Sequence, residues 1–372
     1  MIELKLGSDV AENRARIEAL PNKPAVFILW PQANGKPFLA RTNVLRRRLI
    51  RMVITDGIAA PRVEYQLTGS RLEGQMLVWE LARRFLGSDY RSEIRLRLPA
   101  WVKLILSNTF PRTQITHRIG RAPAVYFGPF RSRASAVHFE AGFLDLFQLR
   151  RCQDDLAPSP EHPGCIYGEM GKCLRPCQQA VGVEEYRGEV GRVAEFLRTS
   201  GRSLAGPAES ARDRLSADMD FEGAALMHQR CQRIAEVVSL RDEMCGELGS
   251  LNGVIVLPSA EANAVEIGWL RRGYWRGMSR LSFLMADGTP ISLDARLREL
   301  AGTVDNSAPV GAGERLERLA VLARWRYSDW CDGEMFLFED DSKIPWRKVV
   351  NAVSRIAQGP PKRKRKTNSG TQ

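Results

Sequence analysis

The sequence predicts a multidomain protein of the α/β class, more closely an α+β arrangement, because strand-like and helix-like segments alternate along 372 residues. A chain of this length exceeds one average domain. Short apolar runs bounded by Gly, Pro, Asn or Asp predict strands, and apolar residues three or four apart predict helices. Hydrophobic residues at 44% and charged residues at 26% are ordinary for a globular fold.

The N-terminal part predicts a strand pair followed by two helices. The stretch "KPAVFILWPQANGKPF" at 23–38 predicts an apolar strand, a turn around Asn34 and Gly35, and the start of a second strand. Downstream, "LRRRLIRM" at 45–52 predicts a very basic helix. A further helix is predicted at 72–85, where apolar residues four apart share one face.

The central part predicts another strand and several helices. The stretch "RAPAVYFGPF" at 121–130 predicts a strand that ends in a Gly-Pro turn, and an apolar-rich helix is predicted at 135–147. Helical spacing recurs at 184–197. Helices at 208–215 and 221–243 are separated by the break "ADMD", which predicts a helical hairpin.

The C-terminal part predicts a separate small α/β unit. Its predicted elements are strands at 254–257, 264–270, 281–285 and 335–338, turns at Asn252-Gly253 and Asp287-Gly288, and helices around 314–325 and 346–356. Five of the eight tryptophans follow residue 268, and "LRRGYWRGMSR" at 270–280 predicts a hairpin that stacks on bases or contacts phosphate. Core packing is the alternative for most of these tryptophans.

These patterns predict five consecutive regions, and their charge predicts a polyanionic partner. The regions are 1–100, 101–205, 206–246, 247–357 and a basic disordered tail, "PPKRKRK" and its neighbours, at 358–372. The net charge of +12 favours nucleic acid, with simple solubility as the alternative. No apolar run approaches the ~18 residues of a membrane helix, and the N-terminus lacks the apolar stretch of a signal peptide. We therefore expect a cytoplasmic protein without a membrane partner.

Four of the seven cysteines fall in one glycine- and proline-rich segment, with spacing Cys-x12-Cys-x7-Cys-x3-Cys. This spacing differs from the paired C-x2-C knuckles of common zinc ribbons. Four thiolates can nevertheless hold tetrahedral zinc or an iron-sulfur cluster. In a reducing compartment such clustering favours metal binding or redox chemistry over disulfides, and chance burial of unrelated cysteines is the alternative.

The phrases "VYFGPFRS", "RRCQDD" and "CIYGEMGKCLRPC" closely resemble the region of the bacterial excinuclease UvrC that follows its N-terminal nuclease domain. The resemblance implies a DNA-repair protein of the excinuclease C/Cho type, acting in nucleotide excision repair. It also implies that a 4Fe-4S cluster, with Zn as the alternative, is held by Cys152, Cys165, Cys173 and Cys177.

The stretch "DFEGAALMHQRCQRIAEVV" at 220–238 resembles the UVR motif of the same family. That motif is a helical hairpin that docks against the UVR hairpin of the repair helicase, the B component of the same excinuclease. The resemblance therefore implies this partner besides DNA. His228 and Gln229 replace the usual Arg-Asp pair of the motif. A hairpin that packs within its own chain is the alternative.

The upstream stretches "LPNKPAVFIL", "KPFLARTNVLRRRL" and "EGQMLVWELARRFL" resemble a GIY-YIG nuclease domain. The resemblance implies that Glu80 holds a magnesium ion and that Arg48 stabilises the transition-state charge. Several motif positions have changed. The motif tyrosines correspond to Phe27, Phe38 and Met52, the glycine to Ala40, the lysine to Arg41, and the asparagine to Arg91 or Ser92.

The substitutions bear directly on catalysis. Phenylalanine has neither donor nor acceptor, so the loss of both phenols removes groups that orient or deprotonate water. Losing such help typically costs ~10²- to 10⁴-fold in rate. One hypothesis is a magnesium-dependent endonuclease that incises near damage, and the other is a catalytically inactive DNA-binding scaffold. The density of guanidinium groups favours phosphate contact by five residues: Arg41, Arg46, Arg47, Arg48 and Arg51. A third hypothesis for the function is an RNA-binding module.

Overall fold

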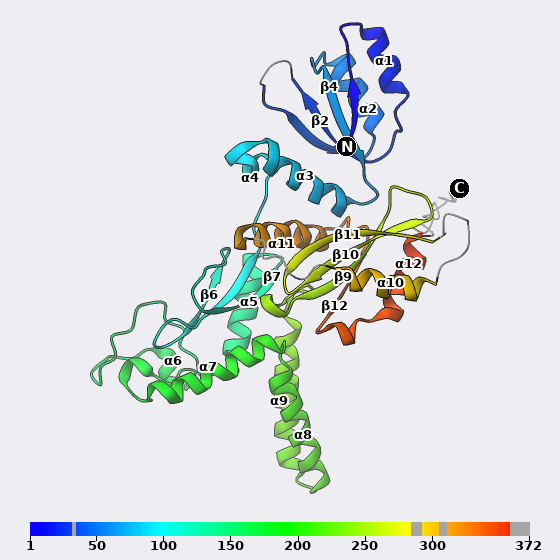
Figure 1. Ribbon diagram of the computed structural model, residues 1–372. Coiled ribbons are helices and arrows are strands. Elements are labelled where there is room, and N and C mark those ends of the chain that lie inside the picture. The colour runs from blue at the N-terminus through cyan, green and yellow to red at the C-terminus, as the bar shows by residue number, and fades with distance from the viewer. Residues whose placement is uncertain (32–34, 284–291, 305–310, 358–372) are drawn as a thin grey trace, which may run out of the picture.

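The protein contains three separate four-stranded sheets with helices packed around them (Figure 1). The computed structural model describes residues 1–31, 35–283, 292–304 and 311–357. Twelve α-helices lie in these described residues, which confirms the predicted mixture of helix and strand. Every strand pair in them is antiparallel, so the fold belongs to the α+β rather than the parallel-sheet class. None of their helices has the length and apolar content needed to cross a bilayer.

The first sheet has helices on both faces, and its strand β2 shows why. In β2, Phe27 points to one face and joins a core with Leu45 and Leu49, while Ile28 points to the other and packs with Leu81. The strands in spatial order are β1 (Ile2–Lys5), β4 (Arg62–Leu67), β2 (Ala25–Trp30) and β3 (Phe38–Thr42). One face carries α1 (Val10–Glu18), α2 (Leu45–Leu49) and the π-helical η1 (Ile50–Thr55), and the other carries α3 (Arg71–Phe85).

These elements confirm the strand pair and both helices predicted in this part, although Asn34 of the predicted turn lies outside the described residues. The α3 helix begins with a reciprocal cap. The hydroxyl of Ser70 accepts a hydrogen bond from the backbone of Glu73 at 3.1 Å, and the Glu73 carboxylate accepts one from the backbone of Gly69 at 2.7 Å. Beyond α3 follow η2 (Gly87–Asp89) and α4 (Tyr90–Glu93).

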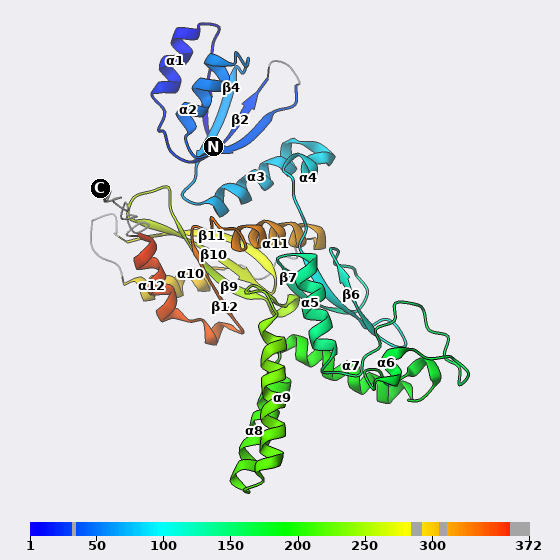
Figure 2. The same ribbon diagram turned by 180° about the vertical axis from the view of Figure 1, so that it is seen from behind.

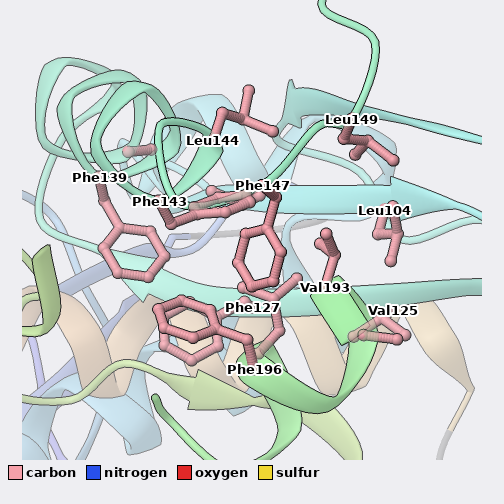
Figure 3. Packing of buried hydrophobic residues seen from close by; sticks show 14 of the residues in the cluster. Leu104, Val125, Phe127, Phe139, Phe143, Leu144, Phe147, Leu149, Val193 and Phe196 are labelled. Atoms are coloured by element: carbon pink, nitrogen blue, oxygen red, sulfur yellow. The ribbon is translucent and has the colours of Figure 1, made fainter. Parts of the chain in front are cut away.

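The middle sheet packs against a cluster of phenylalanines (Figure 3). The strands in spatial order are β6 (Arg112–Thr116), β5 (Ala100–Ile105), β7 (Ala124–Phe130) and β8 (Gly246–Glu247), and the covering helices are α5 (Arg133–Leu144) and α7 (Val183–Arg198). Rings of Phe127 and Phe139 stack 5.0 Å apart at this junction. Gly128, which precedes Pro129 through a cis peptide, has a φ of +154°, and a Cβ there would lie 2.9 Å from Trp101. Backbone and packing therefore both require glycine in the "YFGP" stretch.

A helical hairpin projects from the body of the molecule (Figures 1 and 2). It consists of α8 (Arg202–Ala217) and α9 (Phe221–Ser239), which pack along each other as the sequence predicts. Asp220 caps α9 by accepting a hydrogen bond from the backbone of Gly223 at 2.9 Å. Apolar side chains at and near its turn are exposed: Met219 at 77%, Phe221 at 68% and Leu226 at 68%.

The C-terminal sheet lies between α11 on one face and two helices on the other. Its strands in spatial order are β11 (Tyr274–Ser282), β10 (Ala264–Arg271), β9 (Asn252–Pro258) and β12 (Glu334–Phe338). The helices are α10 (Leu293–Gly302), α11 (Ala312–Arg326) and α12 (Trp346–Ala357), with short turns η4 (Leu248–Ser250) and η5 (Asp341–Lys343). Trp269, Trp275 and Trp325 are buried, so they pack in the core and are not free to stack on bases.

One predicted turn in this unit is wrong. Asn252 and Gly253 begin strand β9, where Gly253 pairs with Leu270 of β10 and with Leu337 of β12. Two neighbouring strands supply the backbone partners that turn propensity alone does not count, so tertiary pairing overrides the local signal. The predicted turn at Asp287-Gly288, the end of the strand predicted at 281–285 and the basic tail at 358–372 lie outside the described residues.

Candidate functional site

The positions of the two motif tyrosines lie together on the α1–α2 face of the first sheet. The ring centroids of Phe27 and Phe38 are 6.2 Å apart, and Phe27 pairs across the strands with Ala40. Phe27 has no exposed surface, and Met52 is buried in the same cluster. The structure therefore brings these degenerate positions together, with Phe27 and Met52 buried and Phe38 44% exposed, and none of the three side chains can orient water. The one phenol in this cluster is that of Tyr65, which pairs across the strands with Phe27.

The basic side chains of this module divide between the two sheet faces. Helix α2 buries its leucines in the core on the α1–α2 face, so its arginines turn outward. Exposed or half-buried on that side are Arg46, Arg47, Arg48 and Arg51. Arg41 instead lies against α3, where its side chain fills the space beside Gly74. Burial, together with the charge of Arg71, lowers the pKa of Arg41. The structure thus does not join the five predicted phosphate contacts into one surface.

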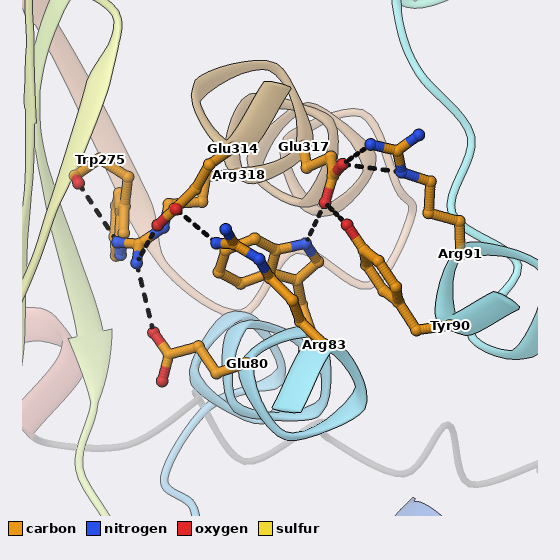
Figure 4. Close-up of polar contacts among 9 residues, drawn as sticks. Glu80, Arg83, Tyr90, Arg91, Trp275, Glu314, Glu317 and Arg318 are labelled. Carbon is orange, nitrogen blue, oxygen red and sulfur yellow. Dashed lines mark hydrogen bonds and ion pairs between the residues drawn. The ribbon is translucent and has the colours of Figure 1, made fainter. Parts of the chain in front are cut away.

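Glu80, the predicted metal ligand, faces α11 of the C-terminal unit (Figure 4). Its Oε1 lies 4.0 Å from Nη2 of Arg318, and that arginine also pairs with Glu314 at 2.9 Å. Loss of solvent raises the pKa of Glu80, and the charge of Arg318 offsets part of the rise. Arg318 is 21% exposed and stacks 5.0 Å from the ring of Trp79. A guanidinium therefore stands beside the carboxylate that the resemblance assigns to magnesium.

A buried carboxylate fixes α11 onto α3 and α4. Glu317 is 3% exposed and accepts hydrogen bonds from Nε1 of Trp79 at 2.9 Å, from the hydroxyl of Tyr90 at 2.5 Å and from Nε of Arg91 at 2.8 Å. Figure 4 shows these three donors converging on it from the α3–α4 side. Arg91, one of the two positions predicted for the motif asparagine, thus serves this contact between units.

The first sheet separates the side chains that metal-dependent cleavage would need together. Glu80 and Arg48 belong to helices on opposite faces of the sheet, and the Phe27 pair lies on the Arg48 side. A one-carboxylate metal site needs the ion, the arginine and the water-orienting group around the same phosphate. In the part of the chain that the structure describes, no group of three or more His, Cys, Asp or Glu side chains is placed to hold a metal ion.

The cysteine segment wraps around two short helical turns, α6 (Ile166–Glu169) and η3 (Pro176–Gln178). Cys173 and Cys177 are buried, Cys152 is half-buried and Cys165 is exposed. The backbone N–H of Arg175 donates to Sγ of Cys173 at 3.4 Å. Nη1 of Arg150 lies at the same distance from Sγ of Cys152. Donors directed at sulfur are the surroundings that stabilise thiolates.

The four thiols are near enough to affect one another's charge. Burial, together with the charges of Cys165, Cys152 and Cys177, raises the pKa of Cys173 to about 11. A cation bound among them would reverse this effect, so the donor set fits an iron-sulfur cluster or zinc in its chemistry. The four sulfurs do not form a coordination site in the structure, because within the described residues no three of them are close enough together to bind one metal ion.

The sequence comparisons agree with the resemblance. The family described as UvrC/Cho excinuclease, middle domain, matches residues 100–196, which include the middle sheet and the cysteine segment. This chain is a UvrC-type excinuclease homologue. It is 23% identical over 273 residues to the UvrABC system protein C of Dehalococcoides mccartyi, covering 69% of this chain and 44% of that protein. The Moorella thermoacetica protein of the same name is 28% identical, with 62% and 38% covered.

A longer match extends over most of this UvrC homologue. The UvrABC system protein C of Desulfatibacillum aliphaticivorans is 23% identical over 333 residues, covering 85% of this chain and 54% of that protein. The chain thus spans about half or less of the length of these curated relatives. No solved structure matches it.

The sequence alone does not predict the contact between α3 and α11 that sets the surroundings of Glu80. Trp79 and Glu317 are 238 positions apart, and no local pattern links α3 with α11. The segment "ERLERLAVLARWR" does carry Glu314 and Arg318 four residues apart, the spacing of a helical ion pair. That signal predicts an exposed pair along one helix, and it does not predict that Arg318 reaches a second domain.

Proposed function

We propose that this UvrC homologue is a DNA-binding member of a nucleotide excision repair system that does not cut DNA through its GIY-YIG-like module. The observation that carries the proposal is the position of Glu80, which is paired with Arg318 and lies across the sheet from Arg48. The net charge of +12 and the kinship with UvrC/Cho excinucleases support DNA as the polyanion.

The physical argument combines two losses. Phe27 and Phe38 provide no hydroxyl to accept a proton from water or to hold it. Glu80 is half exposed and lies 4.0 Å from Arg318, so a magnesium ion bound to it would stand beside a guanidinium that also bonds Glu314 and stacks on Trp79, and the two cations would repel each other. Each loss alone lowers a metal-dependent cleavage rate, and both occur in this chain.

A nicking assay on damaged supercoiled DNA with magnesium tests the proposal. We expect the natural protein and Glu80→Gln to show equal background nicking. Arg318→Gln, which removes the internal cation, should not restore cleavage, because the tyrosine positions are still phenylalanine. Magnesium-dependent nicking that is lost specifically in Glu80→Gln would support the alternative, an endonuclease that uses Glu80, and would refute ours.

For the cysteine segment we propose a 4Fe-4S cluster held by Cys152, Cys165, Cys173 and Cys177, with zinc as the alternative. The support is the fourfold thiol donor set and the Arg150 and Arg175 donors directed at two of the sulfurs. Anaerobic purification followed by metal analysis and a visible spectrum tests it. Broad absorption with stoichiometric iron supports the cluster, zinc alone supports the alternative, and a folded protein without either metal refutes both.

For the hairpin we propose docking onto a helical hairpin of a partner protein of the repair system, such as its helicase component. The support is apolar surface left uncovered at its turn, where Phe221 and Leu226 are each 68% exposed. The double variant Phe221→Ser/Leu226→Ser should lose partner binding in pull-down experiments while its unfolding midpoint stays unchanged, because exposed positions contribute little to stability. Equal binding by both proteins would refute this docking mode.

A further inference from the structure

Arginines from three separate parts of the chain line two adjacent clefts along one side of α11. A cleft of about 450 Å³ is lined by Arg95, Arg97, Arg131 and Arg324, together with Tyr327. A smaller cleft of about 190 Å³ is lined by Arg41 and again by Arg324. Because Arg324 lines both, the two clefts are adjacent along α11. We call these five arginines the arginine track.

The arginine track is distinguished by the absence of acids. No Asp or Glu is among the described residues that line either cleft. Two other clefts carry acids beside their arginines, including Glu243 and Glu247 in one and Asp340 and Asp341 in the other. The acids nearest the track lie outside the lining of its clefts: Asp242 beside Arg131 and Asp332 near Arg41.

Most guanidinium groups of the arginine track are also exposed enough to bind an anionic ligand. Arg95, Arg97 and Arg324 are exposed, and within the described residues none of the three forms a salt bridge. Nη1 of Arg324 lies 3.5 Å from the carbonyl oxygen of Arg95, which places these two side by side. Arg131 is 58% exposed and forms a long ion pair with Asp242, 4.0 Å from Nε to Oδ1, and Asp242 also accepts a hydrogen bond from the backbone N–H of Arg131 at 2.7 Å. Arg95, Arg97 and Arg324 thus carry charges that no ion pair offsets in the described residues, which favours an anionic ligand.

The backbone at Arg95 provides an independent observation. Arg95 follows α4 with a φ of +51°, the left-handed conformation in which glycine is favoured. The backbone N–H of Leu96 donates to the carbonyl of Arg91 at 2.8 Å, which is the hydrogen bond of a helix-ending Schellman turn. Arg95 is one of seven non-glycine residues with a positive φ in the described residues, and its side chain forms no ion pair there.

We propose that the arginine track binds the phosphodiester backbone of a DNA strand where the nuclease-like, middle and C-terminal units meet. Figures 1 and 2 both show the segment after α4 running past the end of α11 towards the middle sheet, which is how the three units come to share one path. This inference rests on the DNA-binding function proposed above and names the surface that performs it. Phosphate groups repeat along a DNA strand, and each can accept paired hydrogen bonds from a guanidinium group, so a row of arginines suits this ligand.

The test measures the affinity of the full chain for a labelled single-stranded oligodeoxynucleotide and its duplex at several salt concentrations. Arg97→Gln/Arg324→Gln removes two charges from the track. The matched control, Arg214→Gln/Arg230→Gln, removes two charges from exposed positions on the projecting hairpin. Each phosphate contact contributes about 0.7 to the slope of log affinity against log salt for a single strand. We expect the track variant to lose about 1.4 of slope and roughly eightfold in affinity per contact at ~50 mM salt, with the control unchanged.

A second variant separates binding from folding. Arg95→Gly relieves the left-handed backbone, so its unfolding midpoint should stay the same or rise while its salt slope falls by about 0.7. Intact DNA binding with equal slopes in track and control variants would overturn this site and leave the proposed DNA binding standing. No binding of either DNA by the natural chain would overturn both. Tighter binding of an RNA strand of matching sequence would overturn the assignment to DNA.

Discussion

Replacing Glu317 by alanine should release the C-terminal unit from the nuclease-like unit. In the folded protein this carboxylate is almost fully buried and accepts the indole N–H of Trp79 and the hydroxyl of Tyr90. Alanine leaves the buried indole N–H of Trp79 without an acceptor, whereas water can reach the half-buried hydroxyl of Tyr90. An unsatisfied buried donor costs about 1–3 kcal/mol, so docking should weaken by about that amount.

Arg91 contributes less to this estimate, although it also bonds Glu317. Its side chain is 59% exposed, so water replaces the lost carboxylate. Arg91→Ala tests the other side of the pair, because it leaves the 3% exposed carboxylate of Glu317 without this cation, and we expect it to cost about 3–5 kcal/mol. Glu317→Gln retains an oxygen acceptor of the same shape, so its effect should be smaller than that of Glu317→Ala.

Native-state hydrogen exchange measures the effect where it occurs. Amides of α3 and α11 should lose protection by the free energy estimated above in Glu317→Ala, while amides of the hairpin helix α9, which lies away from this interface, should keep theirs. A loss of less than about 1 kcal/mol in α3 and α11 of Glu317→Ala would show that the buried carboxylate does not hold the two units together.

Three further outcomes are expected. Phe27→Tyr/Phe38→Tyr should not restore magnesium-dependent nicking, because the metal position lies across the sheet, and clear nicking would contradict the separation of the two faces. Gly128→Ala should lower the free energy of unfolding through contact with Trp101, whereas Gly188→Ala, in an open helical position, should raise it by up to ~1 kcal/mol. Burial raises the pKa of Glu73 above its ordinary 4.5. The natural protein should therefore lose stability relative to Glu73→Gln as the pH rises from that value. Urea denaturation at a series of pH values measures this, and parallel stability curves for the two proteins would refute it.

The sign of the Glu73 effect follows from proton binding. A carboxyl group with a raised pKa in the folded state holds its proton at a pH where the unfolded chain has already lost it. The folded state then binds more protons, so stability falls as pH increases through that window. Glutamine carries no titrating proton and can still accept the hydrogen bond from Gly69, so the variant preserves the helix cap.

Local elements were predictable because their causes are local. Apolar spacing predicts the helix at 72–85, a break between two periodic segments predicts the hairpin around "ADMD", and both are confirmed. The family was predictable for a similar reason, since a short dense phrase containing four cysteines identifies it. The turn predicted at Asn252-Gly253 was wrong because its signal was also local, whereas the pairing of Gly253 with strands on both sides is not.

The candidate site was predictable in its residues and not in its arrangement. The sequence indicated Glu80, Arg48 and the phenylalanines at the tyrosine positions, but nothing in it showed that the sheet separates Glu80 from the others. It also could not indicate that Arg95, Arg97 and Arg324 share a cleft, because Arg324 lies on a helix more than two hundred positions away.

By itself, the sequence determined the class of fold, the charge that favours a polyanion, the thiol donor set and the absence of phenol hydroxyls at two motif positions. Composition and short-range spacing carry all of these, because they depend on neighbouring residues and on what each side chain can donate or accept. Tertiary structure decided which charges meet. Arg318 lies beside Glu80, and the arginine track forms without acids, only because α11 packs onto α3 and brings together side chains that no local pattern connects.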